Sequence, residues 1–366
     1  MISPLAQRLA QVKWGKFTIN DCAEVLPSSA KLTKENLTDS GSVDVYSSDS
    51  TNNGVVGQTN LEPNYLVTKE TPFYLIFGDH TRAMNIAHRN FSVMDNVKVL
   101  IPKYQEKNVI LFISTAWKKA IPNLGYARHW SKAKDCEFYL PTTQNNEIDF
   151  EFINSFVEEL EAERVEELEA YLTASGLKDY TLTEEEYQAV KNLDSLKYES
   201  FNLEKLFGKS TRGKRLKSAD RKEGHLPFIT AGETNEGISA FIGNDVDIFS
   251  RNTITIDMFG SAKYRNYEYG ADDHIAVVHS DHLTENASIF VTISIHKSSH
   301  NGQFNYGRNF YAKDADNLSI LLPVNDDSPD YKTMALLISA IKKLVIKDVV
   351  KYADSKISAT KTVLGH

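Results

Sequence analysis

The chain has 366 residues, 41% hydrophobic and 25% charged, which is the composition of a globular protein and excludes wholesale disorder. No run approaches the roughly 18 apolar residues of a membrane span, and the first residues lack the apolar core of a signal peptide. Because the net charge is −8, any nucleic-acid site must be a local basic patch. The two cysteines are too few for a disulfide framework and are typical of a protein in a reducing cytoplasm.

Short apolar runs in the first half of the chain predict β-strands at residues 73–77 and 97–102, because Gly, Asp, Asn and Pro bound them. A helical stretch follows at residues 109–120. Apolar residues at three- and four-residue steps then predict a long helix over residues 150–172, which ends near Ser175-Gly176. Strands mixed with helices indicate an α/β or mixed α+β domain, whose sheet order the pattern does not define.

The second half begins after an acidic, polar linker at residues 176–198, in which one short helix is predicted from Thr183. The remaining patterns predict two strands, a helix and a second long helix, at residues 253–259, 274–278, 287–297 and 331–357. The second long helix starts after Ser328-Pro329-Asp330, which is a helix-start signal.

The two halves repeat each other. Short matches lie in the same order about 180 residues apart, at Thr51-Asn52-Asn53-Gly54 and Thr234-Asn235-Glu236-Gly237, Ile76-Phe77-Gly78 and Met258-Phe259-Gly260, Tyr126-Ala127-Arg128 and Tyr306-Gly307-Arg308, and Leu140-Pro141 and Leu322-Pro323. Chance matching is the alternative, but the shared order favours an old duplication. The period is that of a domain, too long for a solenoid, and a duplicated domain suits a two-part target.

The two long helices carry matching apolar stripes and opposite charges. Glutamates dominate residues 150–172, whereas lysines dominate residues 331–357. This complementarity predicts that the helices pair as a coiled coil. The alternative is that each helix packs on its own domain. At about 1.5 Å per residue, a helix over residues 150–172 spans roughly 35 Å, close to one turn of B-DNA.

A basic segment opens the second unit. Residues 208–215 have the glycine and lysine spacing of a phosphate-binding P-loop, but Arg215 stands where that motif needs Ser or Thr. Phosphate contacts with nucleic acid explain the segment better, with a solvated loop as the alternative. Its cations are Lys205, Lys209, Arg212, Lys214, Arg215, Lys217, Arg221 and Lys222.

Two polar segments follow the Phe-Gly pairs and are predicted to be loops that read bases. Arginine and lysine can pair with guanine in a major groove, and asparagine with adenine. The candidates are Asp79, His80, Thr81, Arg82, Ser261, Lys263, Tyr264, Arg265 and Asn266. Secondary candidates, for which turn formation is the alternative, are Thr51, Asn52, Asn53, Arg128, Thr234, Asn235 and Arg308.

Signatures of metal binding and catalysis are weak. His274 and His279 follow Asp272 and Asp273, but no HExxH or other tight ligand set occurs, so no metal is expected. GxSxG is absent, and neither cysteine has a catalytic signature around it. The chain is therefore predicted not to be an enzyme. The rival hypotheses are a self-contained nuclease or methyltransferase and a protein-binding scaffold.

This organisation resembles the DNA-specificity subunits of type I restriction-modification systems. The second unit is most similar to the specificity subunits of type IIB systems, and the resemblance is clearest at residues 227–245 and 252–279. The resemblance implies two tandem target-recognition domains that read a bipartite double-stranded DNA site. It also implies an antiparallel coiled-coil spacer that docks methyltransferase or methyltransferase–nuclease subunits. The segments after Gly78 and Gly260 then inherit the DNA contacts. Asp79 departs from a phosphate-binding role, although a carboxylate can accept from cytosine.

The resulting prediction is a non-catalytic specificity subunit in a hetero-oligomer. Target-recognition domains are expected at residues 1–147 and 198–327, the first spacer helix at 148–176, a linker at 177–197, and the second spacer helix with the tail at 328–366. S-adenosylmethionine and magnesium are expected in the partner subunits and no cofactor in this chain.

Overall fold

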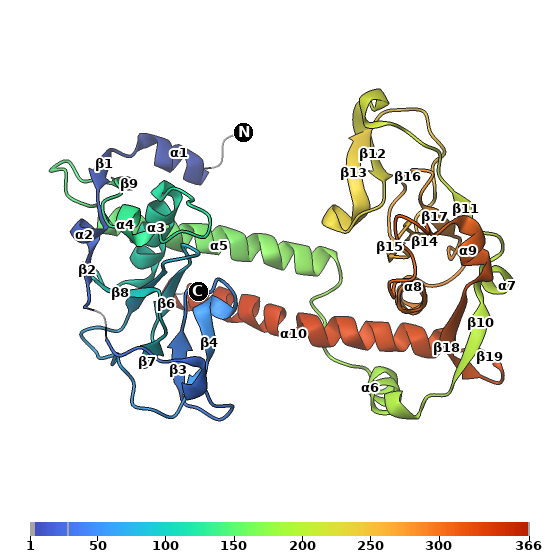
Figure 1. Ribbon diagram of the computed structural model, residues 1–366, viewed down its shortest axis with the longest axis horizontal. Helices are drawn as coiled ribbons and strands as arrows, with labels where there is room; N and C mark the ends of the chain where they lie inside the picture. The colour runs from blue at the N-terminus through green and yellow to red at the C-terminus, as the bar shows by residue number, and fades with distance from the viewer. Residues whose placement is uncertain (1–3, 28, 365–366) are drawn as a thin grey trace. The chain divides into compact units, whose positions relative to one another are not determined.

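The computed structural model describes residues 4–27 and 29–364 (Figure 1). Its contacts divide the chain into two units, one of residues 1–168 with 356–366 and the other of residues 169–355. The long helices α5 (Phe150–Ala174) and α10 (Tyr331–Leu364) each contribute to both units. Both helices were predicted from their apolar stripes and are confirmed.

The first unit contains a four-stranded antiparallel sheet in the order β2-β8-β5-β6, a three-stranded sheet in the order β4-β3-β7, and a two-stranded ribbon of β1 and β9. The strands are β1 (Trp14–Phe17), β2 (Ala23–Val25), β3 (Val43–Tyr46), β4 (Val55–Thr59), β5 (Tyr74–Gly78), β6 (Met84–Ala87), β7 (Phe91–Val93), β8 (Val97–Pro102) and β9 (Phe138–Pro141). The helices before α5 are α1 (Pro4–Gln11), α2 (Ile19–Cys22), α3 (Lys107–Ala120) and α4 (Trp130–Ala133), with short 3-10 turns η1 (Lys34–Asn36) and η2 (Asn52–Gly54).

Strand β5 forms the centre of the first core because every one of its residues is buried. Phe77 of β5 packs against Trp117 of α3, with ring centroids 5.2 Å apart. Ile153, in the first turn of α5, is buried in the same core. The start of the long helix is therefore fixed to the domain that precedes it.

The second unit has sheets in the orders β11-β17-β14-β15, β13-β12-β16 and β10-β18-β19. Its strands are β10 (Tyr198–Asn202), β11 (Thr211–Arg212), β12 (Glu223–Ile229), β13 (Ile238–Ile242), β14 (Thr253–Ile256), β15 (Ala262–Arg265), β16 (Gly270–Ala271), β17 (Ala276–Val278), β18 (Ser319–Asn325) and β19 (Ser328–Pro329). The helices are α6 (Glu184–Lys191), α7 (Leu203–Phe207), α8 (Glu285–Ser299), α9 (Ala312–Asn317) and the first part of α10, with 3-10 turns η3 (Leu193–Ser195), η4 (Ser218–Asp220) and η5 (Thr234–Gly237).

The two units share one topology. Strands β8, β5 and β6 correspond to β17, β14 and β15, and in each unit the middle strand pairs antiparallel with both neighbours. The smaller sheets also match, because β3 pairs parallel with β7 as β12 pairs parallel with β16. This is the arrangement that an internal duplication predicts.

Helix α6 lies in the predicted linker and is the counterpart of α1. Each short helix precedes the first strand of its unit and contacts a long helix, Arg8 of α1 with Ser155 of α5 at 3.3 Å and Glu186 of α6 with Ser339 of α10 at 2.6 Å. The short helix predicted from Thr183 is confirmed, and Thr183 caps it, since its hydroxyl accepts the N–H of Glu186. The segment between the units thus carries structure that belongs to the second unit.

The charges of α10 are used differently from the prediction. Lys332, Lys342 and Lys343 form ion pairs with Glu185, Glu285 and Glu186, all within the second unit. Lysines on this helix were expected to face the glutamates of α5. For these three, the alternative holds, because the helix packs on its own unit and neighbouring acids lie within reach.

Two predicted boundaries around residue 260 are wrong. Strand β14 ends at Ile256 because the side chain of Asp257 accepts the N–H groups of Phe259 and Ser261, which turns the chain. Residues 262–265, expected to be a loop, form β15, with Thr253 opposite Arg265. The Phe-Gly match gave the wrong strand boundary because the two glycines are not equivalent. Gly78 is the last residue of β5, whereas Gly260 lies in the turn after β14.

Candidate DNA interface

Three loops of the first unit meet at the end of β5, at residues 47–54, 78–83 and 122–130, and we call them the first loop cluster. The backbone N–H of His80 donates to Ser48 Oγ at 2.9 Å, and Thr81 Oγ1 donates to the Ser48 carbonyl at 2.6 Å. His80 Nδ1 lies 3.1 Å from the carbonyl oxygen of Tyr126. The structure thus brings together candidates that are far apart in the sequence, at residues 51–53, 79–82 and 128.

Members of the first loop cluster differ in exposure. The exposed members are Thr51, Asn52, Asn53, Thr81 and Arg128. His80 and Arg82 are half-buried, and Arg82 donates from Nη1 to the Ile121 carbonyl at 2.9 Å. Asn52 Nδ2 donates to the Val55 carbonyl at 3.0 Å, so this side chain also shapes the turn, as the alternative proposed.

Asp79 is a structural residue, not a base reader. Its side chain is 5% exposed, and Oδ1 accepts the N–H of Trp130 at 2.6 Å. Its carbonyl oxygen accepts the N–H of His129 at 2.9 Å. The carboxylate therefore holds the loop at residues 122–130 in place, and the prediction that it accepts from a base is wrong.

The second unit repeats the arrangement with loops at residues 230–237, 257–261 and 299–310, the second loop cluster. Gly232 N–H donates to Asp257 Oδ2 at 3.3 Å, and Phe310 N–H donates to the Met258 carbonyl at 2.9 Å. His300 Nδ1 lies 3.1 Å from the carbonyl oxygen of Phe259. The turn η5 carries Thr234 and Asn235 on the exposed surface.

Arg265 was predicted to contact a base, and its burial contradicts that prediction. Its side chain is 1% exposed. Its guanidinium donates to Thr255 Oγ1 at 3.0 Å, to the Tyr267 hydroxyl at 2.9 Å and to the Glu236 carbonyl at 2.8 Å. Arg265 therefore holds turn η5 against the sheet, because a strand residue on this face points into the unit.

Most of the other candidates on β15 and directly beside it also form hydrogen bonds within the unit. Ser261 is buried, and its hydroxyl accepts from Lys263 Nζ at 2.8 Å, while Lys263 also pairs with Glu233 at 3.2 Å. The Tyr264 hydroxyl donates to Asn252 Oδ1 at 3.0 Å, and burial raises the pKa of Tyr264 to about 12. Of the residues proposed here, Asn266 is the exposed one.

The basic segment is exposed, as phosphate contact requires. Lys214 pairs with Asp247 at 2.9 Å but stays 79% exposed, and Arg215 and Lys217 are exposed. Arg221 is different, because it donates to the Leu216 carbonyl and lies over the ring of Phe228 at 5.1 Å. The P-loop alternative fails on geometry, because helix α7 precedes Gly208 and strand β11 lies between Gly208 and Gly213, whereas a P-loop runs from a strand through its glycine loop into a helix.

A cationic hollow connects Arg308 to this segment. Arg212, Arg308 and Lys313 line a hollow of about 630 Å³ together with Asp314. Arg308 Nη1 lies 3.2 Å from Asp314 Oδ2, so one carboxylate offsets part of the charge. The excess of cations makes the hollow suitable for a phosphate.

Two exposed tyrosines were missed as candidates. Tyr126 is 100% exposed and Tyr306 is 86% exposed, and each lies in a loop cluster. The signal was present in the sequence, because Tyr-x-Arg is one of the repeated matches. Only its arginines were taken as candidates.

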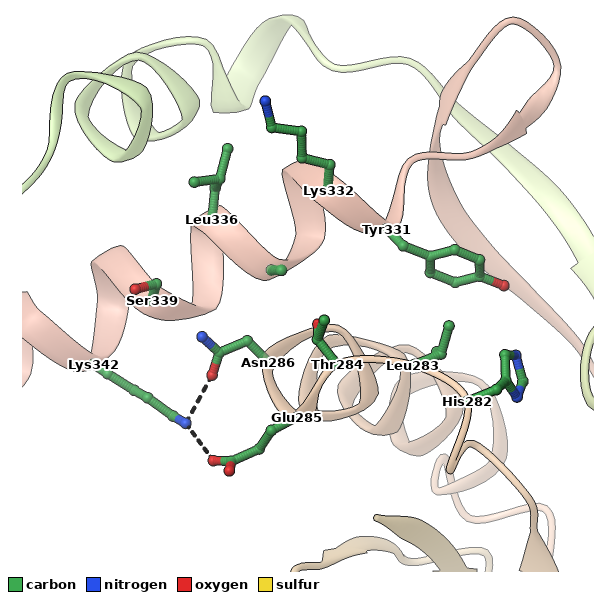
Figure 2. A pocket seen from close by; sticks show the side chains of 11 residues that line it. His282, Leu283, Thr284, Glu285, Asn286, Tyr331, Lys332, Leu336, Ser339 and Lys342 are labelled. Atoms are coloured by element: carbon green, nitrogen blue, oxygen red, sulfur yellow. Dashed lines mark hydrogen bonds and ion pairs between the residues drawn. The ribbon is translucent and has the colours of Figure 1, made fainter. Parts of the chain in front are cut away.

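A second hollow, of about 840 Å³, lies between the start of α8 and α10 in the second unit (Figure 2). Figure 2 shows Lys342 bonded to Glu285 and Asn286, both at 2.8 Å, so its charge is neutralised there. At the corresponding place in the first unit, Tyr104 stacks on Phe150 with ring centroids 4.3 Å apart. We therefore attribute the hollow to looser packing between α8 and α10 than at the corresponding place in the first unit, and we assign no ligand to it.

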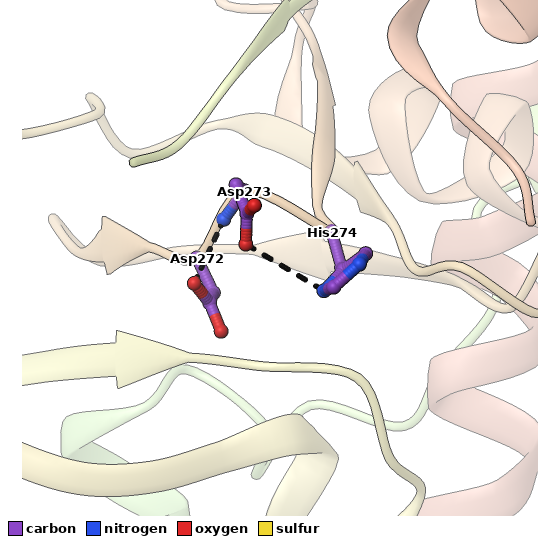
Figure 3. A group of neighbouring side chains, drawn as sticks. All are labelled: Asp272, Asp273 and His274. Carbon is purple, nitrogen blue, oxygen red and sulfur yellow. Dashed lines mark hydrogen bonds and ion pairs between the residues drawn. The ribbon is translucent and has the colours of Figure 1, made fainter. Parts of the chain in front are cut away.

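Asp272, Asp273 and His274 form the one group of the described residues that has the ligand types and closeness of a metal site (Figure 3). The N–H of Asp273 donates to Asp272 Oδ1 at 2.9 Å, and His274 Nδ1 lies 3.5 Å from Asp273 Oδ1. Asp272 also binds the Ile229 carbonyl through its N–H at 2.9 Å. The two backbone hydrogen bonds account for a turn between β16 and β17, while Asp273 Oδ1 is buried and has no hydrogen-bond partner among the described residues. We assign no metal to the group.

Comparison with known proteins identifies the class. The model of the type I restriction modification DNA specificity domain matches residues 11–170 and 196–352, so the chain belongs to this family and carries the domain twice. The specificity subunit S.BcgI of a type II restriction enzyme from Heyndrickxia coagulans is 22% identical over 351 residues, which cover 94% of this chain and 99% of that protein. The S subunit of a type I system from M. genitalium has the same fold, with a TM-score of 0.59 and 15% identity over 96% of this chain and 94% of that one.

The chain is therefore a specificity subunit, the non-catalytic DNA-recognition component of a restriction-modification system, with two tandem target-recognition domains. The resemblance read from the sequence is confirmed. Among the described residues, no helix is both long enough and apolar enough to cross a membrane.

Proposed function

We propose that each loop cluster reads one half of a bipartite double-stranded DNA site. The observation that carries the proposal is the duplication of the cluster, because the same three loops gather at the end of the same central strand in both units. Exposed asparagine side chains at Asn53 and Asn235 suit base edges. The cations at residues 214–217 suit phosphates, which give affinity without sequence information.

The spacer proposal concerns α5 and α10. We place them side by side as an antiparallel coiled coil, as the family resemblance implies. The supporting contact between the two helices is Lys356 Nζ of α10 with Glu161 Oε1 of α5, at 2.6 Å. Lys178, which follows the end of α5, lies 3.7 Å from Asp354 Oδ1 of α10.

The partners proposed are methyltransferase or methyltransferase–nuclease subunits, which would supply S-adenosylmethionine and magnesium. A docking surface for them is the exposed apolar face of α10. Its members are Ile341, Leu344, Val345, Val349 and Tyr352, of which Val345 is 73% exposed. An exposed apolar stripe on a helix commonly binds a helix of a partner protein. The cytoplasm is the proposed compartment, and the free thiols Cys22 and Cys136 are consistent with it.

The test is site selection by the assembled complex. The chain is purified with a methyltransferase subunit from its source organism that co-purifies with it, and bound duplexes are recovered from a random pool and sequenced. Two specified segments separated by unspecified base pairs are expected, with affinity that falls steeply as salt rises. Enrichment of one continuous motif would contradict the bipartite reading. Salt-independent or absent binding would favour the scaffold hypothesis, and methylation or cleavage by the purified chain alone would favour the enzyme hypothesis.

A further inference from the structure

Tyr126 and Tyr306 have the highest fractional exposure among the large apolar and aromatic side chains that the structure describes, at 100% and 86%. Burial of a tyrosine ring is favourable, so a ring left in solvent contributes little to folding. The same residue type is exposed at the same place in both copies of the domain. This coincidence needs an explanation outside the stability of each unit.

Both tyrosines sit at the tips of reverse turns. In the first unit, Ala127 N–H donates to the Leu124 carbonyl at 3.3 Å, and Gly125 has φ +66°, which leaves Gly125 and Tyr126 at the tip. In the second, Asn305 and Arg308 exchange two backbone hydrogen bonds of 3.0 Å around Tyr306 and Gly307. A tip residue extends furthest from its domain and is therefore suited to contact a binding partner.

Each tip is attached to its loop cluster. The Tyr126 carbonyl lies 3.1 Å from His80 Nδ1, and the ring of Tyr306 meets that of Phe259 edge-on, with centroids 5.2 Å apart. An arginine follows two residues later in each case, Arg128 or Arg308. Each loop therefore offers a phenol ring and a guanidinium, which match the mixed surface of duplex DNA, where deoxyribose carbons are apolar and phosphates are anionic.

We propose that Tyr126 and Tyr306 are DNA-contacting residues, one for each half-site, whose rings pack against the deoxyribose surface of the backbone. This inference rests on the proposed function and adds residues to it. Every nucleotide of a duplex presents a deoxyribose, so the contact strengthens binding without selecting a base. The tyrosines hold the neighbouring loops against DNA, and the exposed polar side chains of those loops discriminate among sequences.

The experiment uses the complex of the full chain with its methyltransferase subunit and a duplex that carries the selected site. Tyr126→Ala and Tyr306→Ala are each expected to weaken binding about 10-fold, because each variant loses an aromatic ring that is buried on binding. Tyr126→Phe and Tyr306→Phe keep the ring and should bind within about 3-fold of wild type. The salt dependence should be unchanged in all four, because no phosphate contact is lost.

Matched controls are Tyr139→Ala on β9 and Tyr187→Ala on α6, whose side chains are 54% and 51% exposed but lie outside the loop clusters. These variants should bind as wild type. Wild-type affinity in both tip Ala variants would overturn the inference. So would loss of co-purification with the methyltransferase subunit at unchanged DNA affinity, which would make the tips a protein contact. Failure of the wild-type complex to select any DNA would overturn the proposed function and this inference together.

Discussion

Arg265 is a buried cation whose hydrogen bonds all stay within the second unit. Arg265→Ala would leave the Glu236 carbonyl and Thr255 Oγ1 without this donor and would open a cavity. We expect the free energy of unfolding to fall by about 3 kcal/mol, measured by urea denaturation. Binding at the second half-site should weaken as well, because turn η5 loses its anchor.

The control for Arg265→Ala is Arg215→Ala, which also removes one arginine but from an exposed position. It should alter the free energy of unfolding by less than about 0.5 kcal/mol. Arg265 would be a base reader after all if Arg265→Ala kept wild-type stability and relaxed the preference at a single base pair.

Residue chemistry in the sequence singled out segments that gather into the two loop clusters, but it could not predict which of their side chains are exposed. Asp79, Ser261 and Arg265 have the side chains that DNA recognition uses, yet each is buried and bonded within its unit. Whether a polar side chain faces solvent depends on strand register and on partners distant in the chain, such as Trp130 for Asp79. Tyr126 was overlooked for the same reason, because an aromatic residue in a sequence is usually assigned to the hydrophobic core.

At the scale of elements, the attachment of α6 to α10 depends on one buried carboxylate. Burial alone would raise the pKa of Glu186, but hydrogen bonds from Ser339, Thr183 and Lys343 outweigh it and lower the pKa to about 2. A carboxyl with an ordinary pKa of 4.5 when unfolded therefore stabilises the fold above that pH, and the contribution is lost as pH falls from 4.5 toward 2.

Glu186→Gln should lower the free energy of unfolding of the second unit by about 2 to 3 kcal/mol at pH 7. The difference from wild type should shrink as the pH of denaturation is lowered through 4.5 toward 3. Glu185→Gln, on the same helix but 65% exposed beside Lys332, should have a small effect at every pH. A difference that stayed constant across this range would show that packing, and not ionisation, holds α6.

The basic segment between α7 and β12 makes a separate prediction. Neutralising Lys214, Arg215 and Lys217 together should weaken DNA binding by the complex at low salt and leave its sequence preference intact. The slope of log affinity against log salt should fall by about 3, close to one for each lost phosphate contact. The assay is a salt titration of binding to the selected duplex.

A charge-matched control removes Lys13, Lys118 and Lys119, which are exposed in the first unit away from its loop cluster. Equal losses of affinity in the two triple variants would show that net charge alone, and not this segment, attracts DNA.

Elements with local periodicity were the ones that sequence patterns predicted well. Helices α5 and α10 follow their apolar stripes, and β8 coincides with the predicted residues 97–102. The end of β14 was misplaced because it depends on Asp257, whose carboxylate turns the chain through two hydrogen bonds. Sheet order and the use of α10 lysines by neighbouring glutamates are long-range properties that no local period encodes.

For the whole molecule, duplication implies that recognition is divided. Each unit has its own cores, built from its own residues, and each loop cluster draws its contacts from one unit. Changes in different clusters share no partner, so their effects on binding free energy should add. Changes within one cluster should not, because the loops contact one another.

The measurement is a pair of double-mutant cycles on the assembled complex. Asn53→Ala and Asn235→Ala, in different clusters, should each cost about 1 to 3 kcal/mol of discrimination at one half-site. Their combination should equal the sum within about 0.5 kcal/mol. Asn53→Ala combined with Thr81→Ala, both within the first cluster, should depart from additivity. Thr81 donates to the Ser48 carbonyl, and Ser48 belongs to the same loop, at residues 47–54, that carries Asn53. Coupling as large between the clusters as within one would mean that the two domains act as a single reading surface.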